Sequence, residues 1–165
     1  MQRDVGRNAN VISIVGIGGL GKTTLAKLVY NDEQVVGHFH LRMWVCVSED
    51  FDVTWLIKEI LKSTLCKIDE TFSLDWLPIR LRELIKDKKF LLVLDDVWNE
   101  DHKKWIELEN LLLGDCKGSK ILVKTWNSSV AAIMDTTSSY NLNGLPKEDF
   151  VSLFVKLSFR VGQEN

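Results

Sequence analysis

Cysteines and long apolar runs are scarce in this chain of 165 residues, and each shortage excludes a class of protein. The three cysteines, Cys46, Cys66 and Cys116, are widely spaced and odd in number. They match neither a zinc site nor a disulfide framework, so reduced thiols in the cytoplasm are the simplest interpretation. No apolar run approaches the roughly 20 residues that span a bilayer. Because no apolar segment follows the charged start of the chain, we expect neither a transmembrane segment nor a secretory signal.

An excess of charge of one sign is also lacking. The chain has 21 lysines and arginines against 23 aspartates and glutamates, and its net charge of -2 implies no general attraction to nucleic acid. A small basic cluster, Lys86, Lys88 and Lys89, is interrupted by Asp87 and is typical of a solvated helix end. Hydrophobic residues make up 45% of the chain, which is ordinary for a globular protein. We therefore expect one domain with a core and no nucleic-acid partner.

The sequence does contain one motif for binding phosphate. Residues 16–23 read GIGGLGKT, which is the P-loop pattern G-x-x-x-x-G-K-[ST], and Thr24 follows. An apolar, β-branched segment precedes the motif at 11–15, and a helical segment follows it at 25–30. Glycines let the backbone turn tightly around an anion, and the helix N-terminus directs N–H groups at one phosphate. The strand and helix on either side favour this interpretation over a glycine-rich surface turn.

The motif gives individual side chains a role. Lys22 can reach the β- and γ-phosphates of a nucleotide, and the Thr23 hydroxyl can ligate Mg²⁺. The residues predicted to bind the nucleotide are Gly16, Gly18, Gly19, Leu20, Gly21, Lys22, Thr23 and Thr24.

Apolar periodicity predicts strands and helices that alternate along the chain. We expect strands at 11–15, 39–47, 90–94, 119–125 and 140–142. We expect helices at 25–30, at 53–65 with Asp52 as N-cap, from 76 or 77 with Pro78 in the first turn, and at 105–113, 128–134 and 149–159. Repeated β-α-β units predict an α/β fold, a P-loop NTPase sandwich of three layers with a mostly parallel five-stranded sheet. The predicted domain is 11–160, with a linker at 1–10 and a tail at 161–165.

Two adjacent carboxylates form the second half of the predicted nucleotide site. Asp95 and Asp96 directly follow the continuous apolar strand 90–94, which is the Walker B arrangement. We assign Asp95 to Mg²⁺, which takes oxygen ligands, and Asp96 to orienting or deprotonating an attacking water as a candidate general base. A solvated acidic pair is the alternative. The P-loop upstream favours the Walker B interpretation, because the intervening residues suffice for one strand and two helices.

These residues match the pattern of a known family. Residues 11–32, VISIVGIGGLGKTTLAKLVYND, together with 39–51, FHLRMWVCVSEDF, and 89–98, KFLLVLDDVW, match three of its blocks, and 118–131 and 140–159 match two later ones. On these segments the chain resembles the NB-ARC nucleotide-binding domain of plant disease-resistance proteins, of the coiled-coil, leucine-rich-repeat (NBS-LRR) class. The resemblance covers nearly the whole chain.

The resemblance implies a nucleotide switch of an intracellular plant immune receptor, acting in defence. In that family the ADP-bound state is closed and resting, exchange for ATP opens the receptor, and slow hydrolysis resets it. Carried over to this chain, the P-loop glycines with Lys22, Thr23 and Thr24 would hold phosphates and Mg²⁺, and Asp95 and Asp96 would be the metal and hydrolysis carboxylates. The implied partners are the coiled-coil and leucine-rich-repeat domains of a full-length receptor.

One departure from the family lies after the fourth strand. The family usually has Thr-Thr-Arg there, and its arginine senses the terminal phosphate, whereas this chain has Lys124, Thr125 and Trp126. Tryptophan cannot supply a charged donor. Losing a charge-assisted hydrogen bond of roughly 1.5–3 kcal/mol would cut discrimination between ATP and ADP by about ten- to over a hundred-fold. Lys124 could replace the arginine if the strand extended far enough for it to share a face with Trp126.

A second departure concerns the ends. Asn165 precedes the family's Gly-Leu-Pro-Leu and Met-His-Asp segments, and we expect residues 144–146 to form a turn before the last helix. We therefore expect a partial NB-ARC domain without its C-terminal helical subdomains. Near the N-terminus, Val5 and Arg7 belong to a Val-Gly-Arg string that resembles the family's adenine-proximal motif.

Three functions stay open on this basis. The first is an ADP/ATP-binding switch module with at most slow, Mg²⁺-dependent ATP hydrolysis. The second is a truncated, non-functional receptor fragment, which the missing subdomains and Trp126 favour. The third is a conventional P-loop ATPase or kinase, although Arg80 and Arg82 fall on a predicted helix and no arginine-rich lid is evident.

Overall fold

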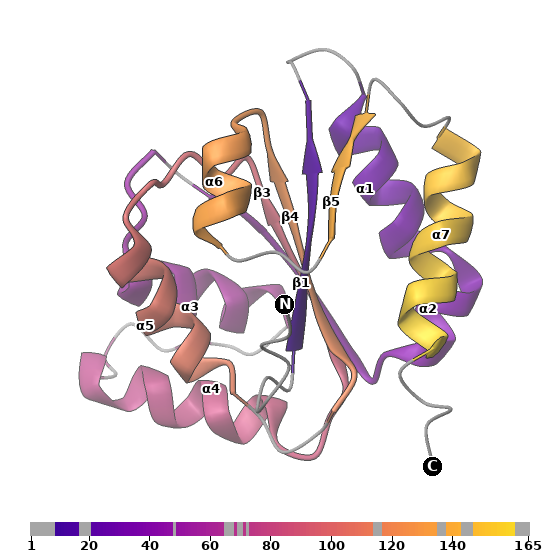
Figure 1. The fold of residues 1–165 in the computed structure, drawn as a ribbon. Coiled ribbons are helices and arrows are strands. Elements are labelled where there is room, and N and C mark those ends of the chain that lie inside the picture. The colour runs from indigo at the N-terminus through magenta and orange to yellow at the C-terminus, as the bar shows by residue number, and fades with distance from the viewer. Residues whose placement is uncertain are drawn as a thin grey trace.

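A parallel sheet between two layers of helices forms the body of the molecule (Figure 1). The structure, a computed structural model, describes residues 9–16, 21–47, 49–64, 68, 71, 73–113, 117–134, 138–142 and 147–160. Its strands are β1 (Ala9–Val15), β2 (Leu41–Cys46), β3 (Phe90–Asp95), β4 (Ser119–Thr125) and β5 (Ser138–Asn141). They pair in the order β2-β3-β4-β1-β5, and every pair is parallel. This confirms the predicted α/β class and the five-stranded sheet.

The helices divide between the two faces of the sheet. Their bounds are α1 (Lys22–Asn31), α2 (Glu33–His38), α3 (Val53–Ser63), α4 (Leu77–Ile85), α5 (His102–Leu111), α6 (Ser128–Ile133) and α7 (Lys147–Arg160), with a 3-10 turn, η1, at Leu74–Trp76. Helices α1, α2 and α7 cover one face, and α3 to α6 cover the other (Figure 1).

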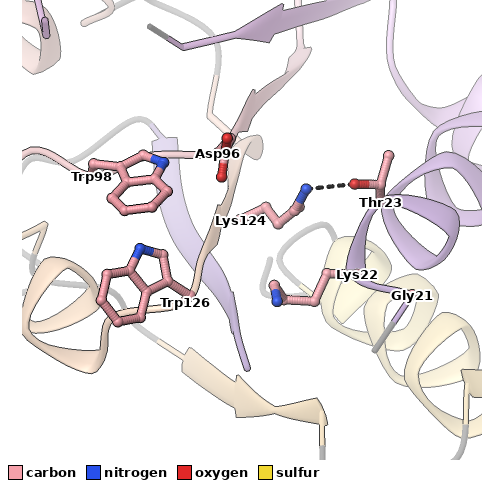
Figure 2. A pocket seen from close by; sticks show the side chains of 7 residues that line it. All are labelled: Gly21, Lys22, Thr23, Asp96, Trp98, Lys124 and Trp126. Atoms are coloured by element: carbon pink, nitrogen blue, oxygen red, sulfur yellow. Dashed lines mark hydrogen bonds between the residues drawn. The ribbon is translucent and has the colours of Figure 1, made fainter. Parts of the chain in front are cut away.

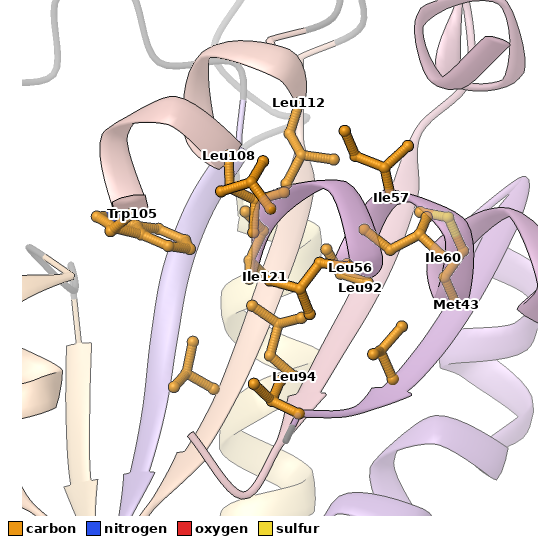
Figure 3. Close-up of a cluster of buried hydrophobic side chains, with 14 of the residues drawn as sticks. Met43, Leu56, Ile57, Ile60, Leu92, Leu94, Trp105, Leu108, Leu112 and Ile121 are labelled. Atoms are coloured by element: carbon orange, nitrogen blue, oxygen red, sulfur yellow. The ribbon is translucent and has the colours of Figure 1, made fainter. Parts of the chain in front are cut away.

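Each face has its own apolar core, because successive strand residues point to opposite sides of the sheet. In β3, Leu92 and Leu94 pack toward α3 and α5 in the larger cluster (Figure 3), which also includes buried residues of α4. Their neighbours Leu91 and Val93 pack toward α1 and α7 in the smaller cluster. All six residues of β3 are buried, as expected for an interior strand covered on both faces.

Local signals for helix starts are confirmed in atomic detail. The Asp52 carboxylate accepts a hydrogen bond from the Trp55 N–H (2.7 Å) and caps α3. Pro78 lies in the first turn of α4, where its missing N–H costs nothing. The other predicted bounds shift by a few residues, because helix and strand ends depend on caps and pairing that periodicity does not report.

Two expectations need correction. Helix α2 was not expected; it begins where Asp32 accepts hydrogen bonds from the N–H groups of Gln34 (2.9 Å) and Val35 (3.3 Å). Strand β1 begins at Ala9, inside the predicted linker 1–10, because Ala9 and Asn10 already pair with β4. The remainder of that linker, the expected turn at 144–146 and the tail 161–165 lie outside the described residues. In the described part of the chain, every helix is too short or too polar to cross a membrane.

Candidate functional site

A cleft of about 670 Å³ opens beside the carboxyl ends of β3 and β4 and the start of α1 (Figure 2). Parallel strands end at the same edge of a sheet, so the segments that follow them converge there. The cleft is lined by Gly21, Lys22, Thr23, Asp96, Trp98, Lys124 and Trp126. Residues of the predicted P-loop and of the predicted Walker B pair therefore meet at one place.

The P-loop side of the cleft ends in a left-handed glycine. Gly21 has φ 78° and ψ 26° and is the N-cap of α1. Side chains with a Cβ rarely adopt this conformation, so a glycine is favoured at this position. Lys22 follows as the first residue of α1 and is buried, and its ammonium donates a hydrogen bond to the Gly16 carbonyl (2.5 Å). The Lys22 side chain is thus held against Gly16, the first residue of the P-loop motif.

The charge of Lys22 is disfavoured by its surroundings. Burial is the main cause that lowers the pKa of its ammonium, and the positive charge of Lys124 lowers it further. The carboxylates of Asp96 and Asp95 act in the opposite direction but do not restore the ordinary value. A bound phosphate would add negative charge beside Lys22 and favour its protonated form.

The acidic pair separates into one buried and one exposed carboxylate. Asp95 ends β3 on the same side of the strand as Leu91 and Val93, which is the side that α1 covers. Asp96 is exposed and has φ 62°, a left-handed conformation that is uncommon for a residue other than glycine. Strained backbone of this kind clusters at functional sites, where the surrounding structure maintains it.

The loop after Asp96 is tied to β4, which explains how that backbone is maintained. The N–H of Val97 donates to the Lys124 carbonyl (3.0 Å), and the Thr125 hydroxyl donates to the Val97 carbonyl (2.8 Å). Gly16 is linked to the same strand end, because its N–H donates to the Thr125 carbonyl (3.3 Å). The end of β4 therefore joins the P-loop to the Walker B loop.

Lys124 links the two halves of the site through its side chain. Its ammonium lies 2.6 Å from Oδ1 of Asp95 and donates a hydrogen bond to Oγ1 of Thr23 (2.5 Å). The register explains the ion pair: Leu94 lies opposite Val123, and Asp95 and Lys124 are the next residues on their strands. Figure 2 shows the Lys124 side chain extended toward Thr23 at the start of α1.

This contact bears on the predicted metal site. Thr23 and Asp95 are the two residues predicted to ligate Mg²⁺, and the Lys124 ammonium contacts both. An ammonium has no lone pair and cannot be a ligand, whereas Mg²⁺ needs oxygen atoms at about 2.0–2.1 Å. A divalent ion about 4 Å from the ammonium would be repelled by about 8 kcal/mol at an effective dielectric constant of about 20. As Lys124 is placed, these residues do not fit a magnesium ion.

The described residues offer no substitute for that metal site: they contain no group of three or more histidine, cysteine and acidic side chains able to hold a metal ion. The remaining predicted binding residues are placed unevenly. Thr24 is exposed and does not line the cleft. Gly18, Gly19, Leu20, Val5 and Arg7 lie outside the described residues.

Two tryptophans form the wall opposite Lys22 and Thr23 (Figure 2). The rings of Trp98 and Trp126 meet edge to face, with centroids 5.2 Å apart, and both side chains remain about half exposed. Strand β4 ends at Thr125, so Trp126 lies beyond it and strand alternation does not relate it to Lys124. Both side chains nonetheless line the same cleft.

Sequence reasoning missed two features of this site. Trp98 was not predicted to line the cleft, although its position just after the acidic pair could have indicated it. The contacts of Lys124 with Thr23 and Asp95 were also missed. The pairing of β3 with β4 would have been the signal, because it brings a lysine and an aspartate at matching strand ends side by side.

Comparisons with known proteins identify the family of the chain. The chain is 44% identical over 155 residues to "Disease resistance protein RGA2" of Solanum bulbocastanum, covering 93% of this chain and 16% of that protein. It is 42% identical over 151 residues to "Putative disease resistance RPP13-like protein 1" of Arabidopsis thaliana, covering 90% of this chain and 14% of that protein. The chain thus spans a small part of the length of these relatives. The family profile of the NB-ARC domain matches residues 2–164, and the chain therefore belongs to the NB-ARC domain family.

Proposed function

We propose that this chain is the nucleotide-binding module of an intracellular plant immune receptor and that it binds ADP and ATP in the cleft. The observation that carries the proposal is the convergence of Lys22, Thr23 and Lys124 at the start of α1. Family membership supports nucleotide binding, and the names of the relatives support a role in plant defence.

The chemistry of the cleft suits a diphosphate. Two ammonium groups, those of Lys22 and Lys124, line it together with the N-terminus of a ten-residue helix. Helix N-termini attract anions because their first N–H groups are unpaired and the helix dipole is positive there. Asp96 is the exposed carboxylate that we propose orients a water molecule, with at most slow hydrolysis of ATP.

Switching would depend on parts of a receptor beyond this module. Moving a two-state equilibrium from 1:99 to 99:1 needs about 5.5 kcal/mol of differential binding. We propose that contacts with further receptor domains, such as a coiled coil and leucine-rich repeats, supply that difference in binding free energy. We propose the cytoplasm as the location of this receptor. The module alone then binds nucleotide without a large change of conformation.

Calorimetric titration of the chain with ADP and with ATP, each in magnesium buffer and in EDTA, tests this proposal. Lys22→Ala should abolish or strongly weaken binding, because it removes the charge held at the base of the P-loop. Lys27→Ala is the matched control, since Lys27 is an exposed lysine of the same helix outside the cleft. Absence of binding in every buffer would support a non-functional fragment, and rapid turnover would support a conventional ATPase or kinase.

A further inference from the structure

We propose that the ammonium of Lys124 takes the place of the magnesium ion, so that this chain binds ADP in its metal-free form. The proposal rests on the nucleotide site proposed above and concerns which ionic form of the nucleotide that site accepts. Its basis is the position of one charged atom. The Lys124 ammonium touches both the Thr23 hydroxyl and the Asp95 carboxylate, the groups predicted to hold the metal.

Lys124 is held at this position by shielded contacts. Its side chain is 12% exposed and that of Asp95 is 9% exposed, so salt and water screen the ion pair little. Moving the ammonium away without replacing it would leave the Asp95 carboxylate buried with Lys22 as a neighbouring cation, and the Lys22 ammonium is bound to the Gly16 carbonyl. A buried charge without its partner is strongly destabilising. While no other cation replaces it, the fold therefore favours keeping Lys124 between the two groups.

The Lys124 charge makes the four ionic groups at the cleft neutral overall. Asp95 and Asp96 contribute two negative charges, and Lys22 and Lys124 contribute two positive charges. Metal-free ADP would bring its phosphate charge to a site that already presents two ammonium groups. A magnesium–ADP complex would bring a divalent cation to the same groups, where it would meet repulsion from Lys124.

The proposal has a consequence for hydrolysis. In phosphoryl transfer a bound metal ion would supply positive charge that neutralises the charge developing on the phosphate oxygens. A single ammonium tethered to β4 carries half the charge of that ion. A chain that excludes the metal should therefore bind ATP without measurable hydrolysis.

The test is whether Mg²⁺ weakens or strengthens the binding of ADP. If Mg²⁺ complexes about nine-tenths of the ADP in solution and the chain binds only the free form, the apparent affinity falls about tenfold. We expect the unmodified chain to bind ADP about tenfold more weakly in excess MgCl₂ than in EDTA. We expect Lys124→Thr, whose short side chain vacates the position between Thr23 and Asp95, to bind more tightly in MgCl₂ than in EDTA. Lys27→Thr should behave as the unmodified chain.

A second measurement needs no variant, which matters because Lys124→Thr removes a buried partner of Asp95. Electron paramagnetic resonance reports free Mn²⁺ through its sharp aqueous spectrum. Adding the unmodified chain to a solution of Mn²⁺ and ADP should increase this signal, because the chain takes ADP and releases the metal. A decrease of the signal would mean that the metal enters the site with the nucleotide, and it would overturn the proposal.

The outcomes separate the two proposals. Binding of ADP that is tighter with Mg²⁺ than with EDTA overturns the role of Lys124 and leaves the nucleotide site intact. It would indicate that Lys124 moves aside when the metal enters. Absence of ADP binding in both buffers overturns the nucleotide site itself and the inference that rests on it.

Discussion

The Lys124 ammonium and the Asp95 carboxylate lie 2.6 Å apart at the carboxyl ends of two neighbouring strands. The sequence around Asp95 or around Lys124 does not by itself indicate this contact, because it does not report which residue the neighbouring strand places beside it. The pair places a positive charge beside Thr23 and Asp95, the residues predicted to bind the metal ion. Its effect on the stability of the fold can be measured without any nucleotide.

Asp95→Asn should destabilise the fold. The change removes the partner of Lys124 and leaves its ammonium largely buried, and breaking a buried ion pair in this way costs about 3 kcal/mol of unfolding free energy. Urea denaturation followed by circular dichroism measures the loss. Glu83→Gln is the comparison, since it breaks the exposed pair with Arg80 and should cost less than about 1 kcal/mol. Equal effects of the two changes would contradict the buried ion pair.

Trp126→Arg should restore discrimination between ATP and ADP. Trp126 lines the cleft but has no charge to place on a terminal phosphate. An arginine there could form a charge-assisted hydrogen bond of about 1.5–3 kcal/mol, which corresponds to about ten- to a hundred-fold in relative affinity. The ratio of the two dissociation constants measures the gain. A ratio unchanged from that of the parent chain would show that this position does not contact the γ-phosphate.

Nucleotide affinity should fall at alkaline pH, and it should do so at a lower pH than for a site whose lysine has the ordinary pKa. Burial and Lys124 lower the pKa of Lys22, and only its protonated form attracts phosphate. Affinity is therefore lost as the pH rises through this lowered pKa. Because Lys124 is the second cause of the shift, Lys124→Thr should move the loss to higher pH. Titrations with ADP across the alkaline range provide the profile, and a profile that Lys124→Thr does not move would contradict this coupling.

Acid should destabilise the chain through His38. Burial lowers the pKa of this histidine, and the nearby charges of Lys89 and Lys120 lower it further. The unfolded chain then takes up a proton more readily than the folded chain, so stability is full above the ordinary histidine pKa of about 6.5 and falls as the pH drops below it. His38→Phe should reduce this loss while keeping an aromatic ring beside Phe159. Urea midpoints at about pH 7.5 and about pH 5 measure it.

His102 provides the control for that experiment. It is exposed at the start of α5, so His102→Gln should leave the dependence of the urea midpoint on pH unchanged. If both variants lost acid sensitivity equally, the burial of His38 would not be its cause.

Much of the fold could be predicted because local signals and the global fold agree. The P-loop lies between a strand and a helix, Asp52 caps α3, and the apolar strand that ends at Asp95 is an interior strand of the sheet. Helix α2 was missed because it is short, and within it only Val35 is buried, so it has no apolar period to detect. Strand pairing carries β1 back to Ala9, which its composition did not indicate.

The chemistry of the site was predicted less completely than its location. The motifs identified Lys22, Thr23, Asp95 and Asp96, because each pattern states which residue type must face the phosphate. They could not identify the partners of Lys124. A single sequence shows which face of a strand a residue takes, but not which residue the next strand places beside it.

The central claim is that this cleft binds a nucleoside diphosphate through Lys22 and Lys124. A crystal structure of the chain grown with ADP and MgCl₂ tests it most directly. The account predicts the diphosphate at the start of α1, with its oxygens on both ammonium groups and no metal between Thr23 and Asp95. A nucleotide bound elsewhere, or a magnesium ion ligated by Thr23 and Asp95 with Lys124 displaced, would contradict it.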